Sequence, residues 1–352
     1  LTTTQLSALT TGQIRAMSTT DVAALTTDQV KALNVLQVAA LSTDAVKAMT
    51  TDQVKVLTDN QVKALTTAAI AALTTSQVGA LTTGQMKVLT AQAAGALSTA
   101  AVAQLTSSQV QQLSNEAVTA LTTAQVQALS TSAVAGLSST QLATLSTSEV
   151  ALLSTGQIGQ LTTTQVKALS ASQIGALETA DMVAMTTSQV GVLNTSQVAA
   201  LTIGMVTAMS TDQVGALGTT NVTALTDNQI KALTTANVAA LTTSQVKVLT
   251  TGQVAALSTA QVAALTTAQI SKLLDTQVKE MSTAQIAAIE AADIAKMTND
   301  QVAAITTSEA AAMSAAQVKA LTTTQLGALN TADVKALTLN SVKAMTAAQI
   351  TA

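Results

Sequence analysis

Acidic side chains are the residues of this 352-residue chain best suited to chemistry. The closest candidates for acid and base catalysis, or for Ca²⁺ binding through carboxylate oxygens, are Asp21 with Asp28 and Asp52 with Asp59. The sequence contains no His and no Cys, so the usual proton shuttle, the commonest metal ligand and thiol chemistry are missing. It also lacks an EF-hand loop and a phosphate-binding loop. We therefore predict no enzymatic activity, no catalytic, cofactor-binding or metal-binding residue, and no small-molecule substrate.

Composition and charge also limit the partners of the chain. Without Phe, Trp or Tyr, no side chain can stack on a nucleic-acid base or fill a pocket with an aromatic ring. The net charge of −3 gives no basic footprint for nucleic acid. No apolar run approaches the roughly 18 residues that a membrane-spanning helix needs. The sequence predicts neither nucleic-acid binding nor a membrane span.

The elements that would position these side chains follow an eight-residue repeat. Leu, Met or Ile recurs at every eighth residue from Leu1 to Met345, which divides the chain into 44 octads. Their consensus, with positions numbered 1 to 8, is Leu-Thr-Thr-x-Gln-Val-x-Ala, and residues 241–248 follow it at every position except position 8, which is Val. Composition does not change along the chain, so we predict one uninterrupted array over residues 1–352. Because neither end carries a polar capping repeat, we expect this array to be a segment of a longer chain or to join other chains end to end.

Each octad carries a complete signal for the start of a helix. Position 2 is Thr, Ser or Asn in 40 octads and position 5 is Gln in 28, which is the spacing of a capping box. Positions 1 and 6 are apolar, as in the hydrophobic staple that accompanies such a box. Acids gather at positions 3 to 5 and bases at position 7, the order that a helix dipole favours. We predict one short helix per octad, over positions 3 to 8 and the next position 1.

A continuous helix and a strand fit the octad less well. Eight residues overshoot two helical turns by about 80°, so an apolar stripe of this period would drift round a continuous helix. The chain has 14 Gly and no Pro, too few for a corner in each octad of a β-solenoid. We interpret the 12 Gly at positions 4 or 7 as small exposed substitutions. The predicted fold is all-α, a superhelical solenoid of 44 short capped helices, and a Thr-rich β-solenoid is the alternative.

A few apolar residues stand at positions that are normally polar. We expect them to mark lateral contacts in an assembly, with neutral drift as the alternative explanation. They are Val35, Leu36, Ile203, Leu274 and Leu339.

Octads of this kind resemble the low-complexity arrays of very long bacterial surface or secreted repeat proteins. The resemblance implies an extracellular or cell-surface location and transfers no catalytic residue. Names given to such proteins suggest adhesion or haem use, but this chain has neither His nor Tyr to bind haem iron. We predict a structural protein that forms a filament, tube or sheath by self-assembly. A rigid stalk of a surface adhesin is the second hypothesis, and ice binding through regularly spaced Thr is the third.

Overall fold

The computed structural model describes residues 1–351 and divides into two compact units, Leu1–Ala184 and Met185–Ala352. Over the described residues the chain forms 44 short α-helices and no strand, one helix in each octad. The predicted all-α solenoid is therefore confirmed, and the β-solenoid alternative is wrong.

The helices of both units are four to six residues long. Those of the first unit are α1 (Thr3–Ser7), α2 (Thr11–Arg15), α3 (Thr19–Ala23), α4 (Thr27–Ala32), α5 (Val35–Ala39), α6 (Thr43–Ala48), α7 (Thr51–Lys55), α8 (Asp59–Ala64), α9 (Thr67–Ala72), α10 (Thr75–Ala80), α11 (Thr83–Lys87), α12 (Ala91–Ala96), α13 (Thr99–Val102), α14 (Ser107–Gln112), α15 (Asn115–Thr119), α16 (Thr123–Ala128), α17 (Thr131–Gly136), α18 (Ser139–Ala143), α19 (Thr147–Ala151), α20 (Thr155–Gly159), α21 (Thr163–Ala168), α22 (Ala171–Gly175) and α23 (Thr179–Ala184). Those of the second unit are α24 (Thr187–Gly191), α25 (Thr195–Ala199), α26 (Ile203–Ala208), α27 (Thr211–Ala216), α28 (Thr219–Ala224), α29 (Asp227–Ala232), α30 (Thr235–Ala240), α31 (Thr243–Val248), α32 (Thr251–Ala256), α33 (Thr259–Ala263), α34 (Thr267–Ile270), α35 (Asp275–Lys279), α36 (Thr283–Ala288), α37 (Ala291–Ile294), α38 (Asn299–Ala303), α39 (Thr307–Ala312), α40 (Ala315–Ala320), α41 (Thr323–Leu326), α42 (Thr331–Ala336), α43 (Leu339–Ala344) and α44 (Ala347–Thr351).

A capping box starts most of the helices as predicted, and α31 illustrates its geometry. Thr242 has an extended backbone, with φ −68° and ψ 156°, and its hydroxyl accepts a hydrogen bond from Gln245 N at 3.2 Å. In return, Thr242 N donates to Gln245 Oε1 at 2.6 Å. The helix ends at position 8, one residue earlier than predicted, because Leu249 at the next position 1 already has an extended backbone (φ −52°, ψ 136°). Its N–H still donates to Val246 O at 3.2 Å, so the last helical turn closes while the chain bends toward the next cap.

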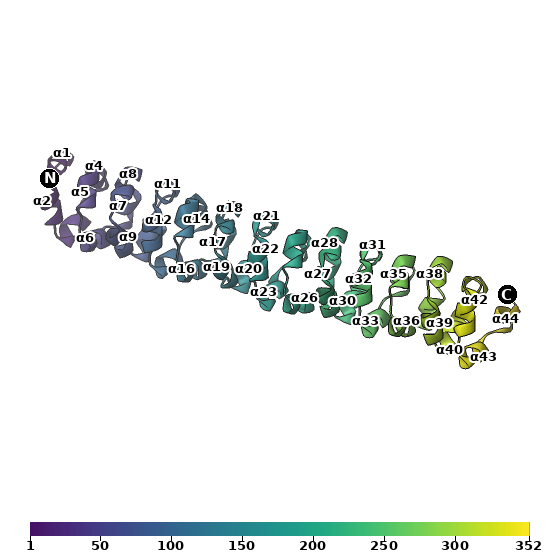
Figure 1. Ribbon diagram of the computed structural model, residues 1–352. Coiled ribbons are helices and arrows are strands. Elements are labelled where there is room, and N and C mark those ends of the chain that lie inside the picture. Colours follow the sequence, from purple (N-terminus) through teal and green to yellow (C-terminus); the bar gives the residue numbers. More distant parts are fainter. Residues whose placement is uncertain (352) are drawn as a thin grey trace. The chain divides into compact units, whose positions relative to one another are not determined.

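Repeated bending between octads brings each helix into contact with the third helix after it. In the first unit α1 packs against α4, α2 against α5, and so on to α20 against α23; in the second unit the pattern runs from α24 against α27 to α41 against α44. Figure 1 shows the ribbon of each unit coiling in this way. The bonds between turns join residues 25 to 31 positions apart, as from Thr207 Oγ1 to Ala232 O and from Gln245 Nε2 to Val214 O. One superhelical turn therefore takes between three and four octads.

The interior of each unit consists of positions 1 and 6. Leu241 and Val246 are 4% and 0% exposed, and nearly every equivalent Leu, Met, Ile or Val away from the outermost helices is buried. A helix of six residues is unstable alone. Each one is held because its two apolar side chains are covered by helices of the turns before and after it, as in other repeat proteins.

Two glycines lie where adjacent turns approach closely, and for Gly95, at position 7, this corrects the interpretation as an exposed substitution. A Cβ atom on Gly136 in α17 would lie 2.6 Å from the Cα atom of Ser107 in α14. A Cβ atom on Gly95 in α12 would lie 2.8 Å from Ala120 O. The absence of a side chain at these two positions lets the backbones of stacked helices come together.

We expect Gly136→Ala to lower the free energy of unfolding by about 1–3 kcal/mol, because the added methyl group overlaps the Ser107 backbone. The matched control is Gly79→Ala in α10, where a Cβ atom would meet nothing within 4 Å. That change should raise stability by about 0.5–1 kcal/mol, since alanine is the better helix former. Urea denaturation followed by circular dichroism measures both values. Equal effects of the two substitutions would contradict the close approach of α14 and α17.

Candidate functional site

Most of the buried polar residues of the array are glutamines at position 5, and these join two turns. Gln245 in α31 is 1% exposed, and its Oε1 accepts from the cap of its own helix. Its Nε2 donates to Leu217 O at 2.7 Å and to Val214 O at 3.0 Å, at the C-terminal end of α27. The last carbonyl groups of a helix have no partner within that helix. One side chain thus satisfies an N–H at the start of its own helix and the Leu217 carbonyl group four helices earlier, and it gives Val214 O, which already accepts from Leu217 N, a second donor. We call this arrangement a glutamine bridge.

Shorter polar residues at position 5 keep part of the bridge. Asn221 Nδ2 donates to Leu193 O at 2.6 Å, and Ser341 Oγ donates to Met313 O at 3.2 Å. Asp293 cannot donate and instead accepts from Thr267 Oγ1 at 2.5 Å, on the neighbouring turn. Over the described residues, no buried side-chain nitrogen or oxygen atom lacks a hydrogen-bond partner.

Like Asp293, three further buried acids at position 5, Asp181, Glu309 and Asp333, have no hydrogen to donate when they are ionised. Asp181 in α23 and Glu309 in α39 are each 3% exposed. Their carboxyl groups accept from Glu178 N at 2.9 Å and from Thr306 N at 2.6 Å. Burial raises the pKa of both carboxyl groups above the ordinary value, and for Glu309 the negative charges of Asp333 and Glu280 also raise it. By the register of the other bridges, Glu309 faces the carbonyl oxygens of Val278 and Met281, which a charged carboxylate repels.

We expect Glu309→Gln to stabilise the second unit by about 1–2 kcal/mol at pH 7, because the amide can donate to these carbonyl groups. The folded state favours the protonated form of Glu309, since burial raises its pKa. Wild-type stability therefore falls as the pH rises from the ordinary glutamate pKa through the raised value. The advantage of the variant should shrink toward zero at about pH 3, where the carboxyl group is protonated in both states.

Denaturation curves across this pH range test the prediction. The control is Asp300→Asn in α38, which removes one negative charge from an exposed position. It should change stability by less than about 0.5 kcal/mol. A gain for Glu309→Gln that is the same at both ends of the pH range would contradict the buried-charge explanation.

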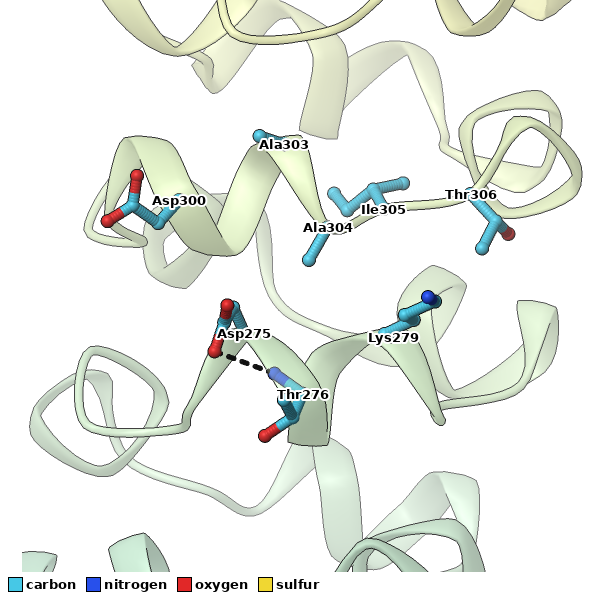
Figure 2. Close-up of a pocket in the computed structure, with 8 residues that line it drawn as sticks. All are labelled: Asp275, Thr276, Lys279, Asp300, Ala303, Ala304, Ile305 and Thr306. Atoms are coloured by element: carbon cyan, nitrogen blue, oxygen red, sulfur yellow. Dashed lines mark hydrogen bonds between the residues drawn. The ribbon is translucent and has the colours of Figure 1, made fainter.

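A surface groove with a volume of ≈ 580 Å³ lies between α35 and α38 in the second unit. Figure 2 shows Asp275, Thr276 and Lys279 on one wall, facing Asp300 and Ala303 on the other. Asp275 Oδ1 accepts from Thr276 N at 2.9 Å, a local bond within its own helix start. The groove thus offers two exposed carboxylates and one ammonium group to water. In residues 1–351, no group of three or more Asp or Glu side chains is arranged to hold a metal ion.

Of the four acids selected from the sequence, Asp21 takes part in helix capping. Asp21, at position 5 of its octad, accepts from Ser18 N at 3.0 Å and from Ser18 Oγ at 2.7 Å. The hydrogen bond from the Ser18 hydroxyl is the main reason that the pKa of the Asp21 carboxyl lies below its usual range.

The five candidate assembly residues are all exposed, as their polar positions predicted. Leu36 and Leu339 project furthest, with 68% and 70% of their surface accessible, and the other three are 40–49% exposed. Leu274 stands at the cap of α35, where only the return half of the box is possible: Leu274 N donates to Gln277 Oε1 at 2.7 Å. Val35 and Leu36 share α5 of the first unit. In the second unit Ile203 lies in α26, Leu274 at the cap of α35 and Leu339 in α43.

Comparison with known families gives the repeat its name. Matches to the family model of the ALTTAQ repeat cover residues 1–35, 36–67, 60–91, 174–209, 227–259, 239–274 and 302–339. Together they include more than half of the chain. The chain belongs to the ALTTAQ repeat family. No curated protein matches it.

No helix in residues 1–351 is long and apolar enough to cross a membrane.

The second role of the position-5 glutamines in this ALTTAQ array was not predicted. The capping box alone explained Gln at position 5, yet glutamate serves a capping box as well. Position 5 nevertheless holds 28 Gln and only two Glu, Glu149 and Glu309. Gln and Glu have the same length, so this preference for Gln indicates that the terminal amide N–H of the side chain donates a hydrogen bond. Only an amide can accept from its own cap and also donate to the carbonyl groups of another turn.

Proposed function

We propose that this ALTTAQ array is a structural protein that assembles with its own copies into a filament, tube or sheath outside the cell. The observation that carries the proposal is the glutamine bridge, which joins successive turns with the same 28-residue and 31-residue spacing in both units. A contact that repeats without change along a chain can be extended by adding octads, and long arrays of such units form elongated structures. An extracellular location is supported by the resemblance to bacterial surface and secreted repeat arrays.

Lateral contact between copies is the second part of this proposal. Large apolar side chains at otherwise polar positions favour association, because burying a leucine gains about 1.5–3 kcal/mol. Leu36 and Leu339 are the most exposed of the five candidates. We assign them to contacts between neighbouring copies, together with Val35, Ile203 and Leu274.

Electron microscopy of the purified chain tests the assembly. We expect uniform fibres, and bundles of fibres where lateral contacts form. Leu36→Thr combined with Leu339→Thr should disperse the bundles while leaving the helical circular dichroism spectrum unchanged, since Thr is common at these positions. The matched control is Leu152→Ala, which removes an exposed leucine outside the candidate set. Compact monomers at all protein concentrations would overturn the proposal.

A rigid stalk of a surface adhesin is the alternative function. It is favoured by the burial of the bridges, because side chains fixed at both ends between adjacent turns resist bending of the superhelix. A stalk requires a non-repetitive binding domain and an anchor in the same polypeptide. The sequence of the parent gene discriminates the two functions, since a filament subunit requires neither.

A further inference from the structure

Stacking of the helices places five lysines that are far apart in the sequence on successive turns of the second unit. We call them the basic row: Lys247, Lys272, Lys296, Lys319 and Lys343. All five are exposed, and they belong to the octads of α31, α34, α37, α40 and α43. Each of these helices packs against the next one in the series. Lys272 and Lys296 stand at position 8 rather than at the usual position 7, and both fall in this row.

The spacing of the row brings its members to neighbouring places on the surface. Successive lysines are 23 to 25 residues apart. Residues 24 apart elsewhere in the array line one surface groove, as Lys279 and Ala303 do, and so do Thr119 and Thr144, which are 25 apart. Helices in contact lie about 8–10 Å apart, so the row offers roughly one ammonium group at each such interval.

Few acids offset these charges. The five octads of the row contain only Glu290 and Asp293 as acids. Asp293 is 5% exposed and accepts a hydrogen bond from Thr267, so it is withdrawn from the surface. Exposed Asp275 and Asp300 follow Lys272 and Lys296 by three and four residues. The five lysines thus still outnumber Glu290 and these two carboxylates, and the row carries a local excess of positive charge on a chain whose net charge is −3. A charge excess of this kind attracts polyanions even when the whole protein is acidic.

The path of the row limits the shape of its partner. A full superhelical turn takes more than three octads, so a helix three octads further along the chain has completed less than one turn. Successive lysines are therefore rotated about the superhelix axis, and the row winds round the unit. In Figure 1, α31 lies along the upper side of the second unit, and α40 and α43 lie along the lower side. A flat membrane surface cannot touch all five lysines at once, and a stiff duplex cannot follow their curve. A flexible linear polyanion can do so.

We propose that the basic row binds a linear acidic polysaccharide that carries one carboxylate in each repeating disaccharide. Charges on such a chain recur at intervals comparable with the separation of stacked helices, whereas nucleic-acid phosphates are several times closer along the strand. The row also lacks aromatic side chains, on which the bases of single-stranded nucleic acid would stack. Lysine provides a mobile point charge that suits scattered carboxylates without a fixed bidentate geometry. This binding does not depend on filament assembly.

The test measures binding of the full chain to hyaluronan, with neutral dextran as the uncharged polymer and oligo(dT) as the nucleic acid. The row variant combines Lys272→Gln, Lys296→Gln and Lys319→Gln. The matched control combines Lys231→Gln, Lys279→Gln and Lys335→Gln, which removes the same charge from exposed lysines of the same unit outside the row. Circular dichroism confirms that both variants remain folded.

We expect the wild-type chain to bind hyaluronan at low ionic strength and not to bind dextran. The row variant should lose at least about tenfold in affinity with a flatter salt dependence, and the control should stay within about twofold. Absence of hyaluronan binding by wild type, or an equal loss in both variants, would overturn the proposal. Tighter binding of oligo(dT) than of hyaluronan at the same salt concentration would assign the row to nucleic acid instead.

Discussion

Replacing Gln245 by glutamate should lower the free energy of unfolding of the second unit by about 3–5 kcal/mol, the cost of an uncompensated buried charge. The carboxylate would keep the bond from Thr242 N but lose both donated bonds, and it would face the carbonyl oxygens of Leu217 and Val214 at the present distances of 2.7 and 3.0 Å. At 1% exposure, no water can replace the lost partners. Gln245→Ala should cost less, about 1–3 kcal/mol, because it leaves Thr242 N and Leu217 O unpaired without adding a charge.

Guanidinium denaturation followed by far-ultraviolet circular dichroism measures these losses. Gln111→Glu is the control, since it introduces the same charge at an exposed position of α14. It should change stability by no more than about 0.5 kcal/mol. If Gln245→Glu were tolerated as well as Gln111→Glu, the glutamine bridge would not contribute to stability.

The second large effect concerns the length of a deletion. Removing the whole octad 241–248 should leave a folded array, because α32 then takes the place of α31. Gln253 would reach Val214 O and Leu217 O in place of Gln245, and the residue types at the new contact match those it now bonds, Val222 and Leu225. The loss should be limited to one nearest-neighbour contact of the array.

Removing half of that octad, residues 241–244, should be far more damaging. All pairs of helices that stack across the deletion would then be displaced by half a repeat, and position 6 would no longer face the core of the adjacent turn. With three such pairs misaligned, we expect a loss on the order of 5–10 kcal/mol and separate unfolding of the segments on either side. Calorimetry of the two deletion variants measures this difference in stability. Similar thermograms for both would contradict the octad as the unit of stacking.

The local structure could be predicted from the sequence because its causes are local. A capping box needs only the Thr and Gln of one octad, so Thr242 and Gln245 predict the start of α31. The apolar positions 1 and 6 likewise identify the interior. The exposure of Leu36 and Leu339 followed from their place among polar positions.

The stacking could not be predicted because it depends on the bend between octads. Small changes in the backbone angles of Leu249 and the residues after it alter how many octads complete a superhelical turn. The residue types at these positions do not indicate the values of those angles. Without the number of octads per turn, the far partners of Gln245 stay unknown. The close approach at Gly136 and the alignment of Lys272 with Lys296 stay hidden for the same reason.

A single cross-linking measurement tests the stacking of every third helix most directly. The chain has no native cysteine. A Cβ atom on Gly191 in α24 would lie 3.9 Å from the Cβ atom of Ala216 in α27, within the range of about 3.5–4.5 Å found in disulfides. Gly191→Cys with Ala216→Cys should therefore form an intramolecular disulfide under mild oxidation. The control pair, Gly191→Cys with Ala208→Cys, places the second cysteine one octad earlier and should remain reduced. Failure of the first pair to cross-link, or equal cross-linking of both pairs, would contradict the superhelix described above.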